Sequence, residues 1–117
     1  MKKVLIVDDS KFIRLSLRTI LEREGFKIVG EAEDGKVAIN KYKELKPDIV
    51  TMDITMPEMD GIEALQEIIN IDPNAKVVML SAVGQQTKVK ASIIAGAITF
   101  IVKPFKEEHL VEVLSKI

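Results

Sequence analysis

The residues best suited to chemistry are polar side chains that each directly follow a short apolar run. They are Asp8, Asp9, Asp53, Ser81 and Lys103. A carboxylate can act as a nucleophile or a metal ligand, a hydroxyl can donate a hydrogen bond, and an ammonium group can neutralise anionic oxygens. Together these are the groups that transfer of a phosphoryl group to an aspartate requires. Whether they act together depends on the elements that position them.

Short apolar runs alternate with amphipathic segments along the chain. The predicted strands are 4–7, 28–33, 48–52, 76–80 and 99–102. The first run is apolar without interruption, which is typical of a strand buried on both faces. In the second run, apolar and polar residues alternate more, which suits an edge strand.

The segments between the strands have the helical spacing of apolar residues. Ser10 and Asp34 are predicted N-caps, Asp60-Gly61 opens a third helix, and further helices are expected over 85–95 and 106–117. The residues predicted to face the core are Ile13, Leu17, Ile20, Leu21, Ala38, Tyr42, Leu45, Leu65, Ile68, Ile69, Val89, Ile93, Leu110, Val113, Leu114 and Ile117.

Five strands that alternate with five helices predict an α/β fold, a doubly wound (βα)5 sandwich around a parallel sheet. Ligands of such sheets bind at the carboxyl ends of the strands. The polar residues singled out above should therefore meet at one rim, with Glu33 and Asp34 farther out beside the edge strand.

Three carboxylates at one rim repel one another, and Lys103 compensates only one of their charges. A hard divalent cation would compensate the rest. Mg²⁺ fits best, because it binds one or two carboxylates, keeps several waters and shares its octahedron with phosphate oxygens. Mn²⁺ is a second candidate. Asp53 would then attack in line and form an acyl phosphate.

Each of these residues also has an ordinary structural interpretation. Asp8-Asp9 is compatible with a turn or helix cap, and Lys103-Pro104 with a surface turn. Ser81 alone could cap the fourth helix, and Asp53 could lie in a solvated loop. Each interpretation is plausible for one residue, but all of them would have to hold together at the same end of one sheet. Such a coincidence is less plausible than a functional site.

In order and spacing, four segments resemble the receiver domain of two-component response regulators. They are Val7-Asp8-Asp9-Ser10, Met52-Asp53-Ile54-Thr55-Met56-Pro57 with Asp60-Gly61, Ser81-Ala82, and Lys103-Pro104-Phe105. The resemblance covers essentially all 117 residues. It implies a flavodoxin/CheY-like strand order of 2-1-3-4-5. It also implies one receiver domain over 1–117, without an output domain.

The resemblance also assigns roles at the metal and phosphoryl site. Asp53 is the expected phosphorylation site, and Asp8 and Asp9 are the acidic pair that holds Mg²⁺, with the backbone carbonyl of Thr55 as a further ligand. Lys103 is expected to pair with the phosphate.

Other residues are assigned to switching and to the lifetime of the phosphoryl group. Ser81 and Ala82 are expected to contact the phosphoryl group, and Phe100 occupies the aromatic switch position, where Tyr is frequent. Thr55 and Val83 are the expected rate-tuning residues. The bond before Pro104 is expected to be cis.

Tyr42–Val50 and Ser81–Gln86 extend the resemblance to single-domain chemotaxis regulators of the CheY type, particularly those of archaea and thermophilic bacteria. This implies a cytoplasmic, monomeric switch rather than an enzyme. A chemotaxis histidine kinase would phosphorylate it, a motor component or adaptor would bind it, and a phosphatase is a further candidate partner. The expected partner-face residues are Lys88, Lys90, Lys106 and Val111. Each of them is also compatible with an ordinary solvated face.

Composition excludes several other functions. The chain has no cysteine, which excludes thiolate chemistry, and a single histidine, which excludes a site that needs two. Its net charge of −1 gives no reason to expect electrostatic attraction to nucleic acid or to an anionic membrane. No G-x-x-x-x-G-K-[ST] loop is present to bind ATP.

Three alternatives stay open at this point. The first is an intermediate receiver in a phosphorelay. The second is an aspartyl-nucleophile phosphatase, although Thr55 stands where such enzymes carry a general acid. The third is an FMN-binding flavodoxin, in which Asp8-Asp9 would repel the phosphate.

Overall fold

The computed structural model covers residues 1–117 and contains all ten predicted elements. The strands are β1 (Lys3–Val7), β2 (Lys27–Ala32), β3 (Ile49–Asp53), β4 (Val77–Ser81) and β5 (Thr99–Val102). The helices are α1 (Lys11–Arg23), α2 (Gly35–Leu45), α3 (Gly61–Ile71), α4 (Gln86–Ala95) and α5 (Glu107–Ser115).

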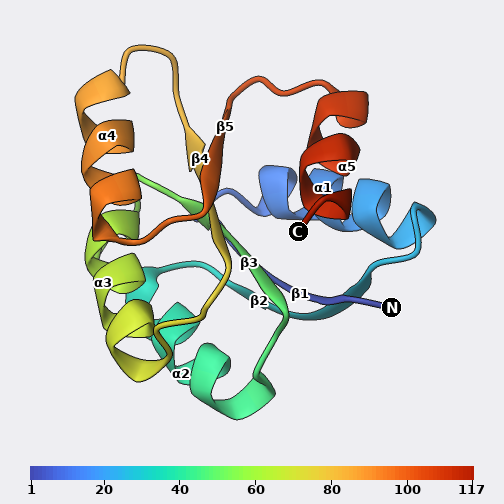
Figure 1. Ribbon diagram of the computed structural model, residues 1–117. Coiled ribbons are helices and arrows are strands. Elements are labelled where there is room, and N and C mark those ends of the chain that lie inside the picture. Colours follow the sequence, from blue (N-terminus) through green and yellow to red (C-terminus); the bar gives the residue numbers. More distant parts are fainter.

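The strands form one parallel sheet in the order β2-β1-β3-β4-β5, which confirms the predicted topology. Figure 1 shows α1 and α5 covering one face of the sheet, while α2, α3 and α4 lie on the other. The β2 strand is at an edge and is only partly buried, in agreement with its alternating sequence.

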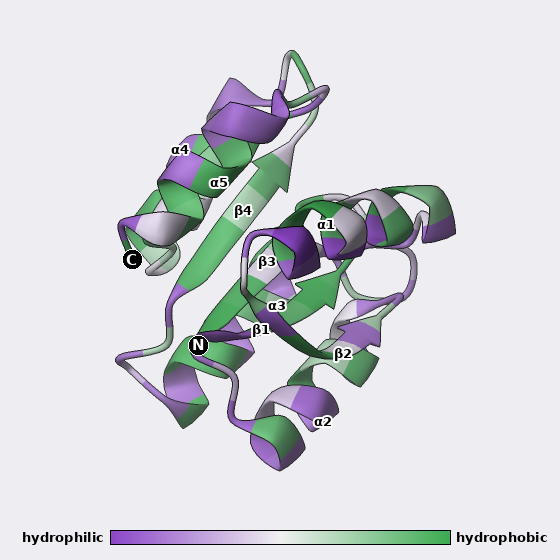
Figure 2. Ribbon diagram, turned by 90° about the vertical axis from the view of Figure 1, so that its right-hand side faces the viewer, coloured by the Kyte–Doolittle hydropathy of each residue, from purple (hydrophilic) through white to green (hydrophobic).

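The core has two parts, one on each face of the sheet. One joins the sheet to α2 and α3, and the other joins it to α1 and α5. The strands β1, β3 and β4 lie between both helix layers and are buried almost throughout. They are accordingly the hydrophobic centre of the molecule in Figure 2.

Side-chain caps set the starts of three helices. The Ser10 hydroxyl accepts from the Ile13 amide at 3.2 Å, and the Asp34 carboxylate accepts from the Val37 amide at 2.9 Å. Asp60 caps α3 in the same way. These contacts satisfy amides that have no partner within the helix.

The prediction that Ile93 faces the core is wrong. Ile93 of α4 is 42% exposed, whereas Ser92 beside it is fully buried. The Ser92 hydroxyl donates to the Val89 carbonyl at 2.7 Å, so its burial leaves no polar group unpaired. The buried side of α4 therefore runs through Val89 and Ser92, and Ile93 lies at its border.

Candidate functional site

The sheet brings the predicted chemical residues to one rim. Asp53 ends β3 and is in register with Leu80, and Ser81 ends β4 in register with Val102. Lys103 directly follows β5, and its amide donates to the Ser81 carbonyl at 2.7 Å. All of these positions are at the carboxyl ends of the strands, as expected for an open parallel sheet.

Three carboxylates meet at this rim. Asp8, Asp9 and Asp53 each offer an oxygen, and these atoms lie within 4.8 Å of one another. Asp8 is completely buried, Asp53 is nearly so, and Asp9 is exposed. One side of the group is therefore held in the protein while the other opens to solvent.

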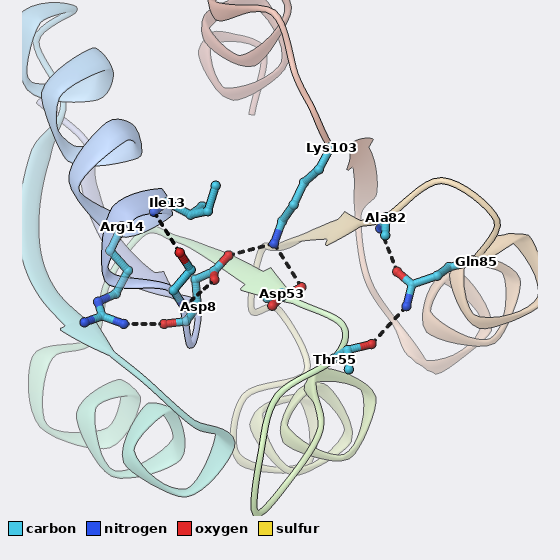
Figure 3. A network of polar contacts seen from close by, with 9 residues as sticks. Asp8, Ile13, Arg14, Asp53, Thr55, Ala82, Gln85 and Lys103 are labelled. Carbon is cyan, nitrogen blue, oxygen red and sulfur yellow. Dashed lines mark hydrogen bonds and ion pairs between the residues drawn. The ribbon is translucent and has the colours of Figure 1, made fainter.

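Lys103 is the cation of the site. Its Nζ lies 2.9 Å from an Asp8 oxygen and 3.2 Å from an Asp53 oxygen (Figure 3). Burial opposes the charged form of Lys103, but the hydrogen bond to Asp8 and the charges of both carboxylates outweigh it and raise its pKa. The lysine therefore stays protonated between the two aspartates.

Asp53 is hard to ionise in this setting. Burial and the negative charge of Asp8 raise its pKa from an ordinary 3.8 to about 6, against the opposing influence of Lys103. The three carboxylates and one ammonium group leave two uncompensated negative charges when all are ionised. The site consequently favours a divalent cation.

The donor set fits a hard cation. All three side chains offer carboxylate oxygens, with no sulfur or imidazole ligand among them, and such oxygens are the ligands that Mg²⁺ prefers. The exposed side of the cluster can also accommodate waters or phosphate oxygens. Asp8, Asp9 and Asp53 can therefore hold a metal such as Mg²⁺.

Ser81 is buried at the rim, and its hydroxyl has no hydrogen-bond partner. It does not cap α4, since Gln85 is the N-cap residue of that helix. The helix-cap interpretation of Ser81 is thus wrong. A buried unpaired hydroxyl is costly, and an anion held on Asp53 would provide the missing acceptor.

The other predicted residues lie around this centre. Thr55, Ala82 and Val83 are exposed in the two loops beside Asp53, and the bond before Pro104 is cis. Phe100 is 41% exposed and lines a groove of about 490 Å³ between α4 and β5. Among the expected partner-face residues, Val111 is half-buried, and the exposed ones are Lys88, Lys90 and Lys106.

Two site residues were not predicted from the sequence. Arg14 of α1 donates to the Asp8 backbone carbonyl at 2.6 Å and also pairs with Glu31. Gln85 connects the loops that follow β3 and β4. A basic residue directly after Ile13, on the half-buried side of α1, was the available signal for Arg14. Nothing in the sequence pattern distinguishes Gln85 from Gln86.

Comparison with known proteins identifies the class. Residues 4–115 match the family described as the response regulator receiver domain. The chain therefore belongs to this family.

The similarity extends to one kind of receiver. The chain is 58% identical over 116 residues to the chemotaxis protein CheY of Thermotoga maritima, covering 99% of this chain and 97% of that protein. It is 54% identical to CheY of Bacillus subtilis over 97% of this chain and 95% of that protein. It is therefore a CheY-type receiver.

A solved structure agrees with this placement. The crystal structure of the CheX–CheY–BeF3–Mg²⁺ complex from Borrelia burgdorferi is similar with a TM-score of 0.94 and 47% sequence identity. The match covers 98% of this chain and 87% of that chain. The resemblance to CheY-type regulators is thus confirmed.

No helix combines the length and the apolar character needed to span a bilayer.

Proposed function

We propose that the protein is a phosphate-operated signalling switch whose phosphoryl acceptor is Asp53. The observation that carries this proposal is the position of the Asp53 carboxylate, 3.2 Å from Lys103 and within 4.8 Å of the Asp8 and Asp9 oxygens. A nucleophile, a fixed cation and a metal-binding cluster are thereby combined at one point.

Asp8, Asp9, Asp53 and the backbone carbonyl of Thr55 would hold Mg²⁺. When bound, the metal neutralises charge on the phosphoryl oxygens and offsets the repulsion among the carboxylates. The similar Borrelia burgdorferi complex contains Mg²⁺, which supports this metal over Mn²⁺.

The donor is the phosphohistidine of a chemotaxis histidine kinase. An Asp53 carboxylate oxygen attacks the phosphorus, the P–N bond breaks, and its electron pair remains on the imidazole. Lys103 pairs with an anionic phosphoryl oxygen and holds the acyl phosphate. In the return step, water attacks the phosphorus, inorganic phosphate leaves, and the Asp53 carboxylate is restored. The protein thus assists both reactions, and the neighbouring Thr55 and Val83 tune the second.

The phosphoryl group changes the partner-binding face. Ser81 donates its free hydroxyl to a phosphoryl oxygen, and Phe100 then moves inward from the groove beside α4. Phe100 has no hydroxyl group, so its movement depends on packing alone. The face formed by α4, β5 and α5 binds a motor component or adaptor, with contacts from Lys88, Lys90, Lys106 and Val111.

The acceptor assignment is tested by labelling with phosphoramidate, a small phosphoryl donor with a P–N bond. Intact-mass spectrometry should show one added phosphoryl group that requires Mg²⁺ and is lost on treatment with hydroxylamine, which cleaves acyl phosphates. The Asp53→Asn variant should not be labelled. Labelling that persists in this variant, or that proceeds equally in EDTA, would refute the assignment.

The output is tested by pull-down from the native cell with and without beryllofluoride, a mimic of the acyl phosphate. Recovery of motor-associated proteins only with beryllofluoride is expected. Recovery of a histidine phosphotransfer protein would instead favour a phosphorelay. Equal recovery in both states would contradict a switch.

A further inference from the structure

Gln85 bridges the two loops on the α4 side of the acidic site. Its side-chain oxygen accepts from the Ala82 amide at 2.6 Å, and its side-chain nitrogen donates to the Thr55 hydroxyl at 2.9 Å. Figure 3 shows the amide group between these two partners, on the side of Asp53 away from Asp8. The side chain therefore ties the loop after β3 to the loop after β4.

Gln85 is also the N-cap residue of α4. Its backbone carbonyl accepts from the Val89 amide at 2.9 Å and so belongs to the first turn of the helix. Its side chain makes no capping bond to α4 and turns back to the preceding loop instead. One residue thus links the start of α4 to the acidic rim.

The Ala82 amide, which Gln85 holds, belongs to the residue directly after Ser81. Ser81 is still joined to β5 through its backbone carbonyl, and Ala82 carries the next amide beyond the end of β4. The adjacent Ser81 hydroxyl is buried and unpaired. An anion on Asp53 would therefore meet two neighbouring donors on this side, one free and one held by Gln85.

The two acceptors for the Ala82 amide differ in charge. The Gln85 side chain is neutral, whereas a phosphoryl oxygen is anionic, and hydrogen bonds to charged acceptors are about twice as strong as neutral ones. We propose that Gln85 is a latch, which holds the Ala82 amide in the resting protein and gives it up to the phosphoryl group. This proposal rests on the proposed role of Asp53 as acceptor.

Release of the latch couples the phosphoryl site to the apolar groove. Gln85 and Ala82 line this groove together with Phe100 and Val102 of β5. Once the Gln85 side chain loses the Ala82 amide, it keeps only its bond to Thr55, so one of the two side-chain ties between the first turn of α4 and the rim is gone. The mouth of the groove can then change shape without movement of the whole helix.

The resting contact is tested first, in the metal-free protein. Hydrogen exchange of the Ala82 amide, followed by NMR, should be faster in Gln85→Ala than in the wild type. Gln86→Ala is the matched control, because Gln86 has the same side chain and lines the same groove but makes no side-chain hydrogen bond. Exchange that is unchanged in Gln85→Ala would overturn the latch.

The competition is tested with beryllofluoride and Mg²⁺. Gln85→Ala should bind beryllofluoride roughly three- to tenfold more tightly than the wild type, which is the ratio expected when one hydrogen bond no longer has to be given up. Gln85→Met, which keeps the length of the side chain, should behave in the same way, and Gln86→Ala should match the wild type.

The outcomes separate the two proposals. If the wild type binds beryllofluoride and the Gln85 and Gln86 variants bind it equally, only the latch is refuted. Weaker binding by Gln85→Ala would show that the side chain supports the loaded state and would likewise refute the latch. If the wild type fails to bind beryllofluoride, the role of Asp53 fails, and the latch fails with it.

Discussion

The raised pKa of Asp53 predicts that removing its charge stabilises the metal-free protein. One pKa unit corresponds to about 1.4 kcal/mol, so displacement from 3.8 to about 6 corresponds to at most about 3 kcal/mol. Because the site opens to solvent on the side of Asp9, screening reduces this figure. We expect Asp53→Asn to raise the free energy of unfolding by about 1–2 kcal/mol at pH 7.

The sign of the effect fixes its dependence on pH. The folded protein retains the Asp53 proton between the ordinary pKa of 3.8 and about 6, where the unfolded chain has released it. The contribution of this group to stability therefore falls as pH rises through this window. The advantage of Asp53→Asn should be near zero at about pH 4 and complete above about pH 6.

The difference in stability between the wild type and Asp53→Asn is measured by urea unfolding in EDTA, followed by far-UV circular dichroism, at pH 4 and at pH 7. Asp60→Asn is a suitable control, because Asn caps a helix as well as Asp does and Asp60 is not one of the three carboxylates at the rim. Added Mg²⁺ should stabilise the wild type more than Asp53→Asn. A gain of the same size at both pH values, or a loss at pH 7, would refute the electrostatic reasoning.

Lys103→Met removes the cation that compensates the fully buried Asp8 carboxylate and should cost about 2–4 kcal/mol in EDTA, measured by urea unfolding; a loss below about 0.5 kcal/mol would contradict the pairing. Tyr42→Phe removes a 2.9 Å hydrogen bond to Asp72 and should cost about 1 kcal/mol in the same assay. Burial and Asp72 raise the pKa of Tyr42, the only tyrosine, to about 12, so its contribution to stability is lost as pH rises from 10 through 12. Ultraviolet titration of the native protein near pH 10 would contradict this.

The sequence alone determined the order of the elements and the rim where the chemistry lies. Apolar runs such as Val4–Val7 and amphipathic segments have different periods, which a local pattern reveals. In a parallel sheet the carboxyl ends of the strands share one edge, so the residues that follow the strands had to converge. Asp53 and Lys103 could be placed together for that reason, although they are far apart in the chain.

Tertiary structure decided how deeply each group lies and which partner it has. The complete burial of Asp8, its 2.9 Å contact with Lys103 and the orphaned hydroxyl of Ser81 depend on distances between separate elements, which no local pattern contains. The same holds for Gln85, whose neighbour Gln86 has the same side chain but a different direction from the backbone. The exposure of Ile93 followed from how α4 packs, because periodicity indicates an apolar side of a helix but not the rotation at which that helix meets its neighbours.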